Sequence, residues 1–61
     1  MKFADYLSEN NLRAYQFAAL VGIGRGQAYR LEKGEPVNLQ ASTIKKIIQA
    51  TNGKVAAEDL L

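Results

Sequence analysis

The stretch Ala14–Gly34, AYQFAALVGIGRGQAYRLEKG, decides the fold of this 61-residue chain. Its apolar residues recur at helical spacing over positions 13–21, which predicts a first helix. Gly22 follows, and a glycine can end a helix in the left-handed conformation without a steric penalty from a Cβ atom. A second helix is expected over residues 25–33, with Gly34 at its stop position. The stretch therefore predicts two short helices joined by a turn at Gly22.

Five residues within this stretch meet the packing demands of a helix-turn-helix. Ala18 is small at the point where the second helix crosses the first, and Gly22 permits a positive φ four positions later. Ile23 supplies an apolar plug in the turn. Ala28 and Leu31 are three residues apart and face the first helix. All five requirements are met in one register, so the signal is more specific than an isolated alanine–glycine spacing.

The flanking segments also have helical patterns. Phe3 and Leu7 are four residues apart, which predicts an amphipathic helix over residues 3–10. Asn38 is a suitable N-cap for a further helix over residues 38–51. The tail after this helix has room for one more helical turn, with Val55 and Leu60 as its anchors. We therefore expect a single domain, an all-α bundle of four to five short helices.

An α+β alternative exists for the C-terminal half. Residues 43–51 contain several β-branched side chains, which favour strands. Asn52-Gly53 is a strong short-range signal for a β-hairpin. However, Ile44, Ile47 and Ile48 fit a period of 3.6 residues and break a period of two, so the helical interpretation is favoured.

Composition restricts the possible functions. The chain has no cysteine and no histidine, so it can form no disulfide and lacks the commonest general base; an enzyme is not expected. No apolar run approaches the roughly 20 residues that a membrane span needs, and the acidic N-terminus does not resemble a signal peptide. We expect a cytoplasmic protein without cofactor or metal. The net charge of +2 permits nucleic-acid binding, and basic residues outnumber acidic ones between Arg25 and Lys33.

These residues resemble the small phage-repressor helix-turn-helix family, which includes Cro and the lambda-repressor DNA-binding domain. The pattern FAxxxGIxxxxxYRLExG, filled by Phe17–Gly34, carries the resemblance. The run IIQATNGKVAAEDL, residues 47–60, is similar to the end of Cro-type and YdaS-type regulators. The resemblance covers roughly residues 12–61. It implies a sequence-specific DNA-binding transcriptional regulator that binds a palindromic operator as a dimer.

The resemblance also implies DNA contacts for six residues of the 25–33 helix: Arg25, Gly26, Gln27, Tyr29, Arg30 and Lys33. Arginine is the side chain best shaped to bind guanine O6 and N7 together, and a helix N-terminus favours a phosphate. A solvated charged face is the alternative for the arginines, and a place over the core is the alternative for Tyr29. Two positions depart from the family: Ala14 stands where a glutamine is frequent, and Gly26 stands where a base-contacting side chain is frequent.

The expected protein is thus a Cro-like phage or prophage repressor. Its expected partner is double-stranded DNA, bound by a homodimer at least on DNA, with no membrane and no small-molecule substrate. Val55, Leu60 and Leu61 are candidates for the contact between monomers, because so small a core leaves apolar groups uncovered. A helix-turn-helix antitoxin or a protein-binding adaptor module is the alternative function.

Overall fold

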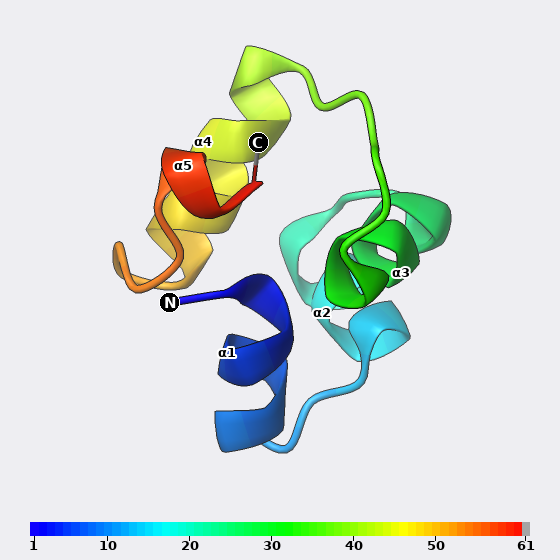
Figure 1. The fold of residues 1–61 in the computed structure, drawn as a ribbon, viewed down its shortest axis with the longest axis vertical. Coiled ribbons are helices and arrows are strands. Elements are labelled where there is room, and N and C mark those ends of the chain that lie inside the picture. The colour runs from blue at the N-terminus through cyan, green and yellow to red at the C-terminus, as the bar shows by residue number, and fades with distance from the viewer. Residues whose placement is uncertain (61) are drawn as a thin grey trace.

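A computed structural model of the chain, which describes residues 1–60, contains five helices (Figure 1). They are α1 (Phe3–Glu9), α2 (Ala14–Val21), α3 (Arg25–Lys33), α4 (Ala41–Ala50) and α5 (Ala57–Leu60). No strand occurs among residues 1–60, so the all-α prediction is confirmed and the β-hairpin alternative is wrong. The hairpin fails because Ile47 is fully buried on one side of α4 and Ile44 packs partly buried beside it, a pairing that needs helical spacing.

The α2–α3 pair has the predicted helix-turn-helix geometry. Ala18 and Ala28 are 1% and 0% exposed, so the two helices approach each other closely at small side chains. Gly22 adopts the left-handed conformation with φ 84° and ψ 36°, and its N–H donates to the carbonyl of Ala18 at 2.8 Å. Ile23 lies half-buried in the turn and packs against the core. The predicted scaffold is therefore confirmed in the register that the sequence indicated.

An aromatic cluster joins α1 to α2. The rings of Phe3 and Phe17 meet edge to face, with 5.0 Å between their centroids, and Tyr6 meets Phe17 in the same way at 6.1 Å. Such pairs add stabilisation beyond the area that they bury. Among residues 1–60, nine form the buried core: Phe3, Leu7, Ala14, Phe17, Ala18, Ala28, Ile47, Val55 and Leu60. Helix α3 packs on both α2 and α1, so the aromatic cluster that joins those two helices also fixes the position of α3.

The start of α4 differs from the prediction. Asn38 is not the N-cap, because the helix begins at Ala41 and Gln40 occupies the cap with an extended backbone. The segment 35–40 runs without helix between α3 and α4. Within it, Leu39 is partly buried against the core, and this contact is made from an extended backbone. Tertiary packing of Leu39 has therefore outweighed the capping preference of Asn38.

Thr51 ends α4 and directs the tail into the core. This buried residue donates its hydroxyl to the carbonyl of Ile47 at 3.0 Å and accepts the N–H of Val55 at 3.2 Å. Val55 and Leu60 are 0% and 6% exposed within the monomer. The prediction that they form the contact between monomers is therefore wrong, since a residue that fills its own core offers no surface. Leu61, the third predicted contact residue, lies outside the described residues.

The two ends of the described chain meet at α5. The carboxylate of Asp59 accepts the N–H of Ala56 at 2.9 Å and forms an ion pair with the amino group of Met1 at 3.2 Å. The hydrogen bond from Ala56, and then the amino group, lower the pKa of Asp59. These contacts hold α5 beside the start of α1, away from the outer side of α3 (Figure 1).

Candidate nucleic-acid interface

Helix α3 carries all six residues that the sequence predicted to contact DNA. About 100° separates successive residues of a helix, so their order around α3 is Arg25, Tyr29, Lys33, Gly26, Arg30 and Gln27. Buried Ala28 and half-buried Leu31 lie on the other side. Five of the six are exposed, and Gln27 is half-buried at one edge of the row. The helix thus presents one continuous outward face, with Gly26 near its centre.

Neither arginine of this face forms an ion pair with an acidic group of residues 1–60. Among residues 1–60 the single ion pair joins Met1 and Asp59, so neither Arg25 nor Arg30 is neutralised by a carboxylate within 4.0 Å. Glu32, a candidate for local pairing with a basic residue, makes no such ion pair in this part of the chain. The two guanidinium groups are therefore available to an external acceptor.

Tyr29 and Lys33 form a local pair one helical turn apart. The Lys33 Nζ atom lies 4.7 Å from the centroid of the Tyr29 ring, which is a cation–π distance. Hydrogen bonding with the Tyr29 side chain, and then its charge, raise the pKa of Lys33 above its ordinary value of 10.5. Tyr29 is 50% exposed, so it is not a core residue. Lys33, in the last turn of α3, thus carries a positive charge at the C-terminal end of the outward face.

Gln27 has a structural role that sequence reasoning missed. Its Oε1 atom accepts the N–H of Gly24 at 3.2 Å, and Gln16 does the same for the N–H of Arg13 at 2.9 Å. Both glutamines are the third residue of their helix, the position from which a Glu or Gln side chain reaches back to the N-cap. The sequence signal for this role was a glutamine three residues after the N-cap position in each helix. In both helices the side chain that binds the N-cap N–H is therefore an uncharged glutamine.

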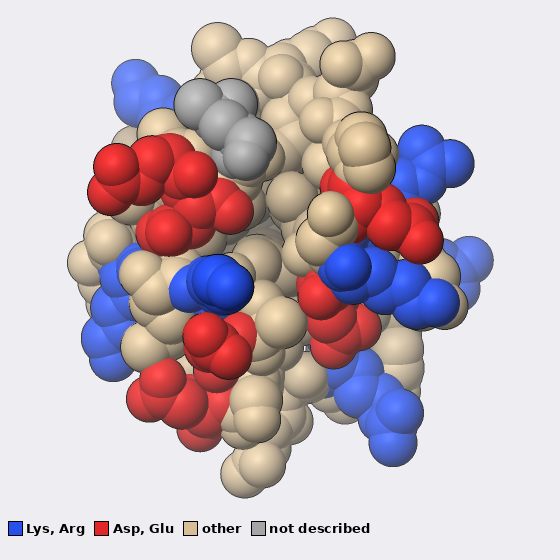
Figure 2. Space-filling view, in the orientation of Figure 1, with Lys and Arg blue, Asp and Glu red and all other residues tan. Residues whose placement is uncertain are grey.

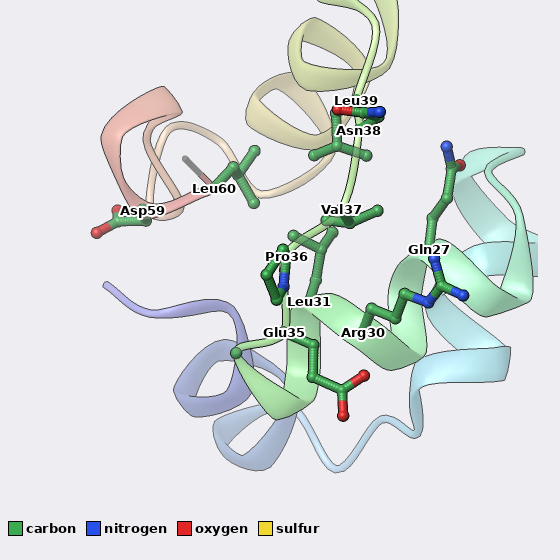
Figure 3. A pocket seen from close by; sticks show the side chains of 11 residues that line it. Gln27, Arg30, Leu31, Glu35, Pro36, Val37, Asn38, Leu39, Asp59 and Leu60 are labelled. Carbon is green, nitrogen blue, oxygen red and sulfur yellow. The ribbon is translucent and has the colours of Figure 1, made fainter.

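Gln27 and Arg30 line an open groove of about 850 Å³ between α3, the segment 35–40 and α5. In Figure 3 the Arg30 side chain extends along α3 towards Gln27, and the carboxylate of Glu35 points away from both. Asp59 and Leu60 border the other side of this groove. Arg30 is therefore placed by α3 itself and not by an acidic neighbour.

A second open groove, of about 530 Å³, lies between the starts of α2 and α3. It brings Arg13 and Tyr15, which the sequence did not single out, beside Arg25, Gly26 and Tyr29. Tyr15 is 54% exposed although it lies at the start of an apolar helix. The only sign of this exposure in the sequence was helical spacing, which places Tyr15 outside the row of buried residues on α2.

Charge alone does not define this interface. In the view of Figure 2, Lys and Arg side chains project from the part of the molecule that holds α2 and α3, with acidic side chains between them. Further acidic groups lie on the other side, over α1 and α5. The outward face of α3 is therefore identified by its register in the helix pair and by its unpaired guanidinium groups.

The crossing of α2 and α3 around Ala18, Gly22 and Ala28 defines a helix-turn-helix domain. The profile of the Cro/C1-type HTH DNA-binding domain family matches residues 2–61, and the chain belongs to this family. That membership makes it a DNA-binding regulatory domain, a class of fold that is not enzymatic. No curated protein and no solved structure matches the chain. No helix within residues 1–60 is both long enough and apolar enough to cross a membrane.

Proposed function

We propose that this domain is a sequence-specific transcriptional regulator that reads its operator through the outward face of α3. The observation that carries the proposal is the pair of exposed guanidinium groups of Arg25 and Arg30, neither of them in an ion pair within residues 1–60. Each is shaped to bind the O6 and N7 atoms of a guanine in the major groove. Gln27, Tyr29 and Lys33 then contact base edges or phosphates beside them.

The proposed regulator is a Cro-like repressor of phage or prophage origin that acts in the cytoplasm. Bound α3 would occlude RNA polymerase from the promoter, and this requires no cofactor. A palindromic operator would take two copies, with their α3 helices about 34 Å apart so that both face the same side of the duplex. The contact between copies would lie outside Val55 and Leu60, which are buried in the monomer.

Selection of bound sequences from a pool of random duplexes tests this proposal. We expect the enriched sequences to share two inverted half-sites about one helical turn apart, whose affinity falls steeply with added salt as phosphate contacts require. A folded protein that enriches no sequence and binds duplexes without salt dependence would contradict the proposal. That result would favour the protein-binding adaptor or antitoxin alternative.

A further inference from the structure

Gly26 is a glycine that the fold does not require. Gly22, Gly34 and Gly53 have φ values of 84°, 75° and 79°, where a side chain would strain the backbone. At Gly24 an added Cβ atom would meet the Gln27 cap at 3.4 Å. Gly26, in contrast, has no positive φ, and a Cβ atom built on it meets nothing within 4 Å.

A glycine inside a helix is unfavourable relative to alanine, because it loses more backbone freedom on folding. Gly26 lies in the first turn of α3, where an alanine would fit the space and favour the helix. A residue that breaks a local rule without a structural compensation points to a constraint outside the fold. For Gly26 the exposed side is the place to look for this constraint, because a Cβ atom added there would meet no other part of the protein within 4 Å.

The feature that Gly26 borders on this side is the groove between α2 and α3. Gly26 is one of the residues that line it, and a Cβ atom added there would stand in open space at the groove. Arg13, the N-cap residue of α2, and Arg25, the first residue of α3, line the same groove, and the half-exposed Tyr15 and Tyr29 line it with them. The groove therefore combines positive charge with aromatic surface.

One occupant matches this combination, the sugar–phosphate backbone of a DNA strand. Its phosphates are anionic and suit Arg13, which has no part in the proposed base contacts, while its deoxyribose rings offer apolar faces to the tyrosines. Glu32, the single acidic residue of the lining, lies about two helical turns beyond Arg25. The negative charge of Glu32 repels a phosphate, so the end of the groove near Gly26 is the favourable place for it.

We propose that Gly26 keeps this groove open so that one DNA strand can lie directly against the first turn of α3. This assignment rests on the proposed function, which it deepens by naming the DNA group that Gly26 admits. It makes Gly26 a determinant of how deeply α3 docks. A side chain at residue 26 would hold the strand away, and would lengthen the phosphate contact of Arg13 and the base contact of Arg25 together.

The test uses Gly26→Ala and Gly26→Leu, with Ser42→Ala as the control. Ser42 is an exposed residue of α4, and its replacement by alanine also favours a helix but lies outside the groove. Each variant is measured by thermal unfolding and by titration with a mixed-sequence duplex of about 20 base pairs at low salt. A random duplex is the appropriate probe because a strand contact carries no sequence information.

We expect Gly26→Ala to unfold at the wild-type temperature or up to about 4–8 °C above it. We expect it to bind the duplex at least about fivefold more weakly, with a larger loss for Gly26→Leu and none for Ser42→Ala. The inference is overturned if both Gly26 variants bind the duplex as tightly as the wild type. It is also overturned if Gly26→Ala lowers the unfolding temperature. Failure of the wild type itself to bind DNA would overturn the proposed function instead.

Discussion

Helices α3 and α5 begin in the same way but with different chemistry. Each N-cap lacks a polar side chain, and the side chain three residues later binds its N–H, Gln27 to Gly24 at 3.2 Å and Asp59 to Ala56 at 2.9 Å. An acidic cap is the stronger one, because it also opposes the positive end of the helix dipole. At α5 it additionally binds the amino group of Met1. The charged cap thus occurs on α5, which carries none of the residues predicted to contact DNA, and the neutral cap occurs on α3, which carries all six.

The largest expected effect concerns the α5 side. Leu60→Ala removes a side chain that is 6% exposed and should lower the free energy of unfolding by about 2–5 kcal/mol. In so short a chain this is a large part of the total stability. Leu20→Ala is a matched control, since Leu20 is 76% exposed and its truncation should change stability by less than about 0.5 kcal/mol. Urea unfolding of both variants checks the prediction, and equal losses would show that α5 does not anchor the core.

The next effect concerns the α3 side and leaves stability nearly unchanged. Arg30→Ala should cost about 1–3 kcal/mol of binding to the selected duplex, because a guanine loses its paired donors. It should cost much less on a mixed-sequence duplex. Lys46→Ala is the control, since Lys46 is an exposed residue of α4. Fluorescence anisotropy on both duplexes separates the two roles: equal weakening by Arg30→Ala on both would mean that Arg30 does not read sequence.

A smaller effect tests the neutral cap directly. Gln27→Glu retains an oxygen that can accept the N–H of Gly24, and its charge should stabilise the start of α3 by a few tenths of a kcal/mol. The same charge beside DNA should weaken binding by about threefold to tenfold at low salt. Gln49→Glu adds an equal charge to an exposed position of α4 and should change binding little. If the Gln27→Glu variant bound as tightly as the Gln49→Glu variant, a neutral cap at α3 would have no role in binding.

The helix pair was predictable from sequence because its constraints are local. Ala18, Gly22 and Ile23 each satisfy a steric requirement set by residues within one or two turns, and α3 was placed at Arg25–Lys33 with both ends correct. The start of α4 was not, because Leu39 packs on residues that are distant in the sequence. No local preference of Asn38 could reveal that contact.

The residues of the candidate site also divide into those that local spacing predicted and those that it could not predict. The outward face of α3 follows from helical periodicity once Ala28 and Leu31 are known to face inward. The groove between α2 and α3 does not, because it depends on how the two helices cross. Arg13 and Tyr15 were therefore missed, although they lie beside predicted residues. Val55 and Leu60 were predicted both as anchors of the last helical turn and as the contact between monomers. Their burial supports the first role, and the sequence could not decide between the two because that burial depends on the turn that Thr51 directs.

The smallest expected effect is a pH dependence at α5. A group whose pKa is lowered by folding contributes stability above its unfolded pKa, here 3.8, and that contribution is lost as the pH falls through the lower folded value. Asp59→Asn keeps an oxygen that can accept the N–H of Ala56 but removes the charge that attracts the Met1 amino group. We therefore expect Asp59→Asn to unfold at a lower temperature than the wild type at pH 7, with the difference shrinking towards pH 3.

Glu58→Gln is the control for this prediction. It removes a neighbouring charge that makes none of these contacts within residues 1–60, and should show a smaller difference at pH 7. A difference for Asp59→Asn that is constant from pH 7 to pH 3 would mean that the lost hydrogen-bond geometry, and not the charge, distinguishes the α5 cap from the α3 cap.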